Sequence, residues 1–72
     1  MMHLRLKDMR TDRDLMQKQI ADFLDIDQRV YSNYETGKRE IPIKHLVKLA
    51  DLYGTSTDYL LGRTNILRPY AK

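Results

Sequence analysis

The sequence predicts an all-α fold, and three observations support that prediction. The stretches 17–24 and 28–36 each keep the apolar spacing of a short helix. Only residues 25–27 separate them, and so short a turn makes two helices cross at a steep angle. Gly54 and Gly62 each follow an apolar segment, where they suit the left-handed position after a helix end. We therefore expect one small helical domain in the 72 residues.

The turn between the two central helices can be built from its residues. Ala21 has only a methyl group where a larger side chain would hold the helices apart. Leu24 and Ile26 supply the apolar wedge between them. Asp27 is a good N-cap acceptor for the amides that open the next helix. That helix should therefore begin near Gln28.

The helix expected over 28–36 has two different faces. At about 100° per residue, Val30, Tyr31 and Tyr34 fall on one side. The other side carries hydrogen-bonding side chains, which are Gln28, Arg29, Ser32, Asn33 and Thr36. Arginine can bond a guanine edge in bidentate fashion, glutamine and asparagine an adenine edge, and serine either. Because a merely solvated face would more often carry Glu and Lys, this face is typical of base reading in double-stranded DNA.

An ordered set of residues extends this pattern over most of the chain. The set is Leu6, Met9, Arg10, Gln17, Ile20, Ala21, Leu24, Ser32, Tyr34, Glu35, Gly37, Leu46, Leu49, Ala50, Tyr53, Gly54, Ser56, Asp58, Tyr59, Leu60, Leu61 and Gly62. Over roughly 4–63 it resembles the lambda-repressor-like helix-turn-helix family, the small DNA-binding domains of phage repressors, Cro-type proteins and related bacterial regulators. No single dipeptide is specific, but the ordered set is.

The resemblance implies a compact five-helix domain, with the second helix across the DNA backbone and the third in the major groove. Helices are expected near 4–13, 17–24, 28–36, 43–53 and 57–61. Independent signals agree with these boundaries. Pro42 suits a first helical position, and Gly54 follows the fourth helix. Ser56 can cap the last helix, with Asp58 near its positive end.

Three positions depart from the family pattern. Asp25 stands where the family usually has glycine, which is tolerable because Asp visits left-handed conformations more readily than most residues. Met16 replaces the usual Ser or Thr before the second helix and cannot cap it. Tyr31 replaces a branched aliphatic side chain, so its hydroxyl must lie at the edge of the core or find a partner. Together they predict a turn of less than average stability.

A single apolar core is expected. Its members are Leu6, Met9, Leu15, Ile20, Leu24, Ile26, Ile41, Leu46, Leu49 and Leu60. Within it, Leu15 and Ile41 should pack at the two ends of the helix-turn-helix. Four tyrosines fall at core-facing or rim positions, which argues against a stacking platform for single-stranded nucleic acid. They are Tyr31, Tyr34, Tyr53 and Tyr59.

The resemblance also implies roles for individual residues. The expected base readers are Gln28, Arg29, Ser32 and Asn33. The expected DNA phosphate contacts are Gln17, Lys18, Thr36, Lys38 and Arg39. Gln17 opens the second helix, whose exposed amides favour phosphate in any case; for these residues simple solvation is the alternative. The family pairs Arg10 with Glu35 in a partly buried ion pair, so Arg10 is left out of the DNA contacts although it is basic.

The placement of charge is more informative than the total of +3. Residues 17–27 carry −2. Arg29, Lys38 and Arg39 instead cluster at the reading face and in the loop after it, where the family touches phosphate. The cations therefore lie where a DNA backbone is expected.

Composition disfavours several other classes. With no cysteine, the chain can form neither a disulfide nor a thiolate site, as suits a reducing cytoplasm. His3 and His45 have no partner at ligand spacing, and no serine has a His and acid in relay, so neither a metal site nor an enzyme is expected. The apolar runs are too short for a membrane span or a signal peptide. No cofactor, small-molecule ligand or membrane partner is expected.

The chain divides into a DNA-binding domain over 1–63 and a tail over 64–72. The tail has no helical period, yet it contains Ile66, Leu67 and Tyr70, which would be wasted in a solvated end. They are expected to dock on the body or on a partner. Because the family often dimerises through the fifth helix and the segment after it, we expect a homodimer through 57–70. Such a dimer would read a pseudo-palindromic operator, with its two third helices about 34 Å apart.

The sequence thus predicts a cytoplasmic, bacterial or phage-encoded transcriptional regulator that binds double-stranded DNA, with repression as the expected mode. The alternative is a helical protein-interaction module or an antitoxin-type partner-binding protein. The outward face over 28–36 discriminates between them, because an interaction module would show apolar or acidic residues there.

Overall fold

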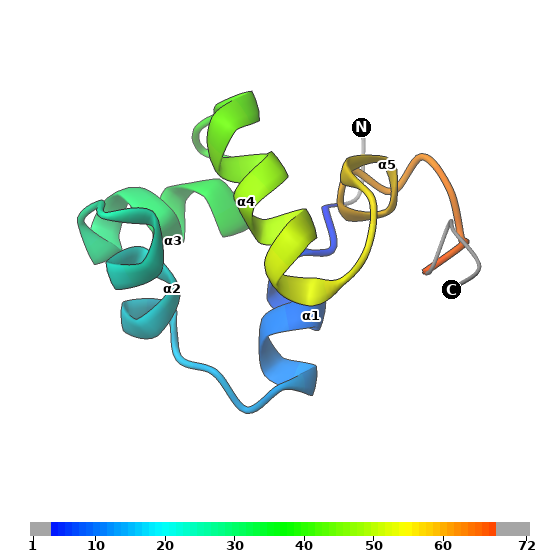
Figure 1. The fold of residues 1–72 in the computed structure, drawn as a ribbon. Coiled ribbons are helices and arrows are strands. Elements are labelled where there is room, and N and C mark those ends of the chain that lie inside the picture. Colours follow the sequence, from blue (N-terminus) through cyan, green and yellow to red (C-terminus); the bar gives the residue numbers. More distant parts are fainter. Residues whose placement is uncertain (1–3, 68–72) are drawn as a thin grey trace.

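Five helices follow one another in the computed structural model, which describes residues 4–67 (Figure 1). They are α1 Leu6–Asp12, α2 Gln17–Leu24, α3 Gln28–Thr36, α4 Ile43–Tyr53 and α5 Thr57–Leu60. The described part of the chain contains no strand, so the all-α prediction is confirmed. Only the outer helices differ from their expected bounds: α1 is shorter at both ends than 4–13, and α5 ends one residue before 61.

In Figure 1, α4 lies in the middle, with α2 and α3 on one side and α5 on the other. The buried hydrophobic residues form one cluster, to which all five helices contribute. They are Leu6, Met9, Ile20, Ala21, Leu24, Tyr31, Tyr34, Leu46, Leu49, Ala50, Tyr53 and Leu60. Leu15, Ile26, Ile41 and Tyr59 are partly buried against this cluster. The expected core is therefore confirmed, with Leu15 and Ile41 packed at its margin.

The turn between α2 and α3 has the geometry that its residues predict. Asp25 adopts the left-handed conformation, with φ 59° and ψ 46°. The Ile26 amide then donates to the Ala21 carbonyl at 2.9 Å, which closes the end of α2. Asp27 caps α3, because its Oδ1 accepts from the Arg29 amide at 2.7 Å. A non-glycine residue thus occupies the left-handed position.

The start of α2 is capped by a residue inside the helix. The Met16 side chain has no oxygen to offer, and it is 63% exposed. The Met16 amide instead donates to Gln19 Oε1 at 2.7 Å, which is the returning half of a capping box. Gln19 therefore provides a side-chain acceptor at the start of α2, which Met16 cannot provide.

The later helices begin and end close to the expected signals. Ser56 Oγ accepts from the Tyr59 amide at 3.0 Å and caps α5. Gly54 and Gly62 both take positive φ, at 67° and 76°. Pro42 differs by one residue from its expected place, because its extended ψ of 148° puts it before the first helical residue, Ile43.

Tyr31 lies inside the core. Its exposed fraction is 0%, so its hydroxyl does not reach the edge of the core. The hydroxyl oxygen faces Glu35, but it forms no hydrogen bond of ordinary geometry within residues 4–67. Burial, and secondly the neighbouring Glu35 carboxylate, raise the pKa of Tyr31 far above its usual value. Tyr31 therefore stays neutral in the folded protein.

The two ends of the described chain meet at Arg5. Its amide donates to the Leu60 carbonyl at 2.8 Å, and its guanidinium lies over the Tyr59 ring, 4.1 Å from the centre. The guanidinium also donates to the carbonyl oxygens of Tyr59 and Thr64 and, at 2.7 Å, to Asn65 Oδ1. Residues 64 and 65 are thus held against the body. Tyr70, the third apolar residue expected to dock, lies outside the described residues.

Candidate nucleic-acid interface

The outward side of α3 is the candidate interface. Gln28 and Arg29 are exposed, and Ser32 and Asn33 are half-buried. On the opposite side of the same helix, Tyr31 and Tyr34 are buried in the core, with Tyr34 5% exposed. The four expected base readers are therefore brought together on one helix whose other side is anchored.

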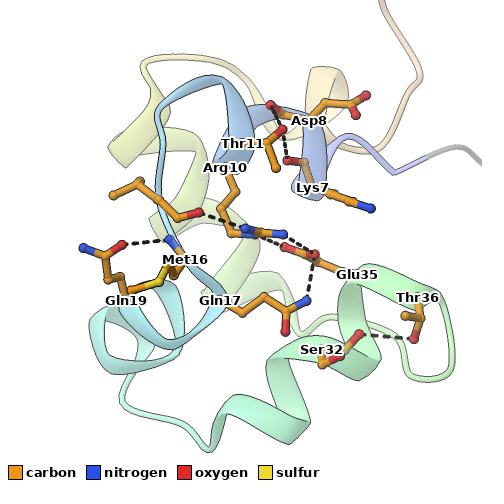
Figure 2. Close-up of polar contacts among 11 residues, drawn as sticks. Lys7, Asp8, Arg10, Thr11, Met16, Gln17, Gln19, Ser32, Glu35 and Thr36 are labelled. Atoms are coloured by element: carbon orange, nitrogen blue, oxygen red, sulfur yellow. Dashed lines mark hydrogen bonds and ion pairs between the residues drawn. The ribbon is translucent and has the colours of Figure 1, made fainter.

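A buried ion pair ties α3 to α1. Arg10 Nε lies 2.7 Å from Glu35 Oε2, and Arg10 Nη2 donates to Oε1 at 3.1 Å (Figure 2). The two side chains are only 11% and 3% exposed. A third donor, Arg10 Nη1, contacts the Leu15 carbonyl at 2.8 Å. These contacts direct three of the five guanidinium N–H donors into the fold.

Gln17 joins this ion pair from the first position of α2. Its Nε2 donates to Glu35 Oε1 at 3.1 Å, while its oxygen points away from the carboxylate (Figure 2). Burial by itself would raise the pKa of Glu35, but the hydrogen bonds from Arg10 and Gln17 and the charge of Arg10 lower it. Because an amide nitrogen carries two hydrogens, the contact with Glu35 leaves one for a further acceptor.

The other expected phosphate contacts lie in different settings. The Thr36 hydroxyl is within hydrogen-bonding distance of the Ser32 and Asn33 carbonyls, at 3.1 and 3.3 Å, so its one hydrogen is directed into the helix. Lys18 Nζ lies 3.7 Å from Asp22 Oδ2, an exposed contact of little strength. Lys38 and Arg39 are exposed after Gly37, which ends α3 at φ 80°.

Two arginines have structural roles that no sequence pattern predicts. Arg13 Nη2 donates to the Tyr53 carbonyl at 2.9 Å, and its guanidinium lies 4.9 Å from the Tyr53 ring centre. Arg5 likewise donates to the Tyr59 carbonyl and lies over the Tyr59 ring. Both contacts join residues at least 40 positions apart, so no local spacing signals them. Like Arg10, both guanidinium groups donate to backbone carbonyls within the fold.

The structure also locates the residues considered for other chemistry. Among residues 4–67, no group of three or more His, Cys, Asp or Glu is placed to hold a metal ion. His45 is buried on α4, while His3 lies outside the described residues. No helix in the described part is long and apolar enough to cross a membrane.

Comparison with known proteins relates this geometry to a family. A family model described as Helix-turn-helix matches residues 6–60. The chain is 46% identical over 61 residues to the SPbeta prophage-derived uncharacterized HTH-type transcriptional regulator YonR of Bacillus subtilis (strain 168), covering 85% of this chain and 56% of YonR. It is 42% identical to the HTH-type transcriptional regulator ImmR of the same organism, covering 86% and 49% of the two chains.

A more distant relative comes from another genus. The chain is 31% identical over 64 residues to the Cryptic phage CTXphi transcriptional repressor RstR of Vibrio cholerae, covering 86% of this chain and 58% of RstR. The chain thus spans about half the length of the curated relatives that it matches. No solved structure matches it significantly. The matched range runs from the first residue of α1 to the last of α5, and the chain belongs to the lambda-repressor-like helix-turn-helix family.

Proposed function

We propose that this chain is a sequence-specific DNA-binding transcriptional regulator of the repressor type, which places α3 in the major groove of double-stranded DNA. One observation carries the proposal: α3 buries Tyr31 and Tyr34 while it presents Gln28 and Arg29 to solvent. A helix held in this way can enter the groove as a rigid body and offer donors to base edges. The names of the relatives, among them a phage repressor, support the regulatory role.

In this proposal Arg29 reads guanine, and Gln28 and Asn33 read adenine, because these side chains match the hydrogen-bonding edges of those bases. Ser32, half-buried between them, permits close approach or bonds either base. These four residues supply the sequence information. The proposal places the activity in the bacterial cytoplasm, where the double-stranded DNA lies.

Phosphate contacts on both sides of α3 would set its register. Gln17 and Lys18 come from the start of α2, and Lys38 and Arg39 from the loop after α3. Thr36 would have to turn its hydroxyl out of the helix to donate to a phosphate, because its hydrogen is directed to a backbone carbonyl. We therefore expect Thr36 to be the weakest of these contacts.

We further propose a two-fold dimer through residues 57–70 that binds a pseudo-palindromic operator. Ile66 and Leu67 support this, since they are 60% and 41% exposed although the segment just before them is held by Arg5. Burying two such side chains from each copy would favour association. The dimer would place its two α3 helices about 34 Å apart, one helical turn of DNA.

Selection from a randomised duplex library tests the proposal. Wild type should enrich an inverted repeat with half-sites one helical turn apart, and the double variant Arg29→Ala, Asn33→Ala should enrich none. Lys7→Ala is the control, since Lys7 is an exposed cation on α1, and it should enrich the same repeat. Weak binding that enriches no sequence and disappears with added salt would mean that only charge is involved, and would contradict the proposal.

A further inference from the structure

The outer side of α4 exposes apolar residues that neither the core nor the candidate DNA interface uses. Ile43 is 77% exposed and Val47 is 43% exposed, and they lie one turn apart on the same side of the helix. Phe23, near the end of α2, is 44% exposed. A single exposed apolar side chain needs no explanation, but several on neighbouring elements indicate an interaction surface.

Two lysines lie between these apolar residues. Lys44 and Lys48, the positions after Ile43 and Val47, line a cavity of about 480 Å³ between α4 and the turn that precedes α3. Lys48 Nζ also lies 5.7 Å from the centre of the Phe23 ring, so the cavity and Phe23 form one continuous surface. Neither lysine pairs with a carboxylate in the part of the chain that the structure describes.

The cavity has an apolar and a cationic lining. Leu24 and Ile26 supply apolar lining, and Asp25 supplies one carboxylate against the two lysines. Burial, and secondly the charges of Lys44 and Lys48, lower the pKa of His45, which also lines the cavity and is neutral at pH 7. The charge of the lining is therefore +2 from the lysines and −1 from Asp25, or +1. The buried His45 Nδ1 has no hydrogen-bond partner among residues 4–67.

We propose that this surface, defined by Phe23, Ile43, Lys44, Val47 and Lys48 and named here the α4 surface, binds an acidic, amphipathic segment of a partner protein. Lys44 and Lys48 form a row, named here the lysine row. It runs between Ile43 and Val47 on one side and the cavity with Phe23 on the other. A matching segment has a row of carboxylates with apolar side chains on both flanks. Its carboxylates would meet the unpaired lysines, and its apolar side chains would cover Ile43 and enter the cavity.

Two other occupants fit less well. A DNA backbone would satisfy the lysines, but it offers nothing apolar to cover an Ile43 that is 77% exposed. A second copy joined by a two-fold axis through the lysine row would oppose Lys44 and Lys48 to the same lysines, and Asp25 supplies only one carboxylate per copy. The proposed partner therefore goes beyond the proposed function, and it does not depend on whether the chain binds DNA.

The test uses the whole chain labelled with ¹⁵N and a blocked helical peptide of about 16 residues with one row of Glu between two rows of Leu. The peptide should shift amide resonances of residues 23–26 and 43–48. The same peptide with Gln for every Glu should bind about tenfold more weakly, the effect of losing two contacts of partly exposed charges.

Single variants assign the binding to the α4 surface. Lys44→Ala and Lys48→Ala should each weaken peptide binding about threefold, and Ile43→Ser about fivefold, with folding intact because all three side chains are exposed. Lys7→Ala, which removes one exposed lysine from α1, should leave peptide affinity unchanged.

Four results would overturn the proposal. They are no binding up to about 1 mM peptide, equal binding of the Gln peptide, shifts confined to other helices, and loss of affinity in Lys7→Ala that equals the loss in Lys44→Ala. If duplex DNA shifted the amides of residues 43–48, or if these amides shifted with protein concentration alone, the α4 surface would belong to DNA or to a second copy instead.

Discussion

The side-chain amide of Gln17 donates a hydrogen bond of 3.1 Å to Glu35, the carboxylate that neutralises Arg10. One of the expected phosphate contacts is thereby joined to the ion pair that holds α1 against α3. Because a carboxylate can only accept, the contact fixes the orientation of the Gln17 amide, with its NH2 group toward Glu35. Folding and phosphate binding are thus expected to depend on the same side chain.

Two binding measurements test the expected phosphate contact of Gln17. We expect Gln17→Leu to weaken operator binding about tenfold, the loss of one hydrogen bond to a charged acceptor. The salt dependence of binding should not change, because glutamine carries no charge to release a counterion. Lys38→Ala is the comparison, and should reduce the slope of log affinity against log salt by about one. Anisotropy titrations at several salt concentrations measure both quantities, and an unchanged affinity in Gln17→Leu would limit Gln17 to a structural role.

The Arg10–Glu35 pair predicts a non-additive effect on stability. Glu35→Ala should lower the free energy of unfolding by about 3 kcal/mol, because Arg10 would remain charged and nearly buried without its partner. The double variant Arg10→Met, Glu35→Met should lose less free energy of unfolding than Arg10→Met and Glu35→Met lose together as single variants. The reason is that the double variant leaves no buried charge. Urea unfolding measures all of them. Additive costs would show that the two residues do not act as a pair.

The same carboxylate predicts a pH dependence. Contacts in the folded protein lower the pKa of Glu35 below its ordinary value of 4.5. The stabilisation is therefore fully present above pH 4.5 and is lost as the pH falls through the lower pKa of the folded state. Urea midpoints measured from pH 7 to pH 3 should show the advantage of wild type over Glu35→Gln shrinking below pH 4.5. An advantage that stays constant over this range would contradict the account.

Arg5 predicts a local effect at the end of the chain. In Arg5→Ala the contacts with Tyr59, Thr64 and Asn65 are lost. Amide exchange of residues 60–66 should therefore become faster, while unfolding becomes easier by about 1–2 kcal/mol. Arg5→Lys keeps the charge but not the planar group, and should restore only part of the protection. Equal exchange in wild type and Arg5→Ala would mean that Arg5 does not hold this segment.

Much of this fold could be predicted because its signals are local. Ala21, Asp25 and Asp27 lie within seven residues, and each acts on the backbone beside it, so the turn and the start of α3 could be inferred from spacing. The contacts of Arg5 and Arg13 could not, since they join residues at least 40 positions apart and depend on the completed packing. The capping role of Gln19 is local too, but Met16 as a poor N-cap does not indicate it, because the acceptor belongs to the reciprocal half of a capping box three residues later.

The candidate site was less predictable than the fold. Which side of α3 faces solvent follows from helical period, but the orientation of individual polar groups does not. Thr36 directs its hydroxyl back to the helix, and Gln17 directs its amide to Glu35. Both orientations are set by neighbouring acceptors, which a list of residue types does not reveal.

The most direct test of the central claim, that α3 reads bases, measures the affinity of wild type, Arg29→Ala and Lys38→Ala for the selected operator and for each of its single-base substitutions. We predict that Arg29→Ala loses about 1–3 kcal/mol and becomes indifferent to the base at one position of each half-site, while Lys38→Ala weakens binding to all sequences alike. If Arg29→Ala weakened every sequence equally and kept the full base preference, the claim would be contradicted.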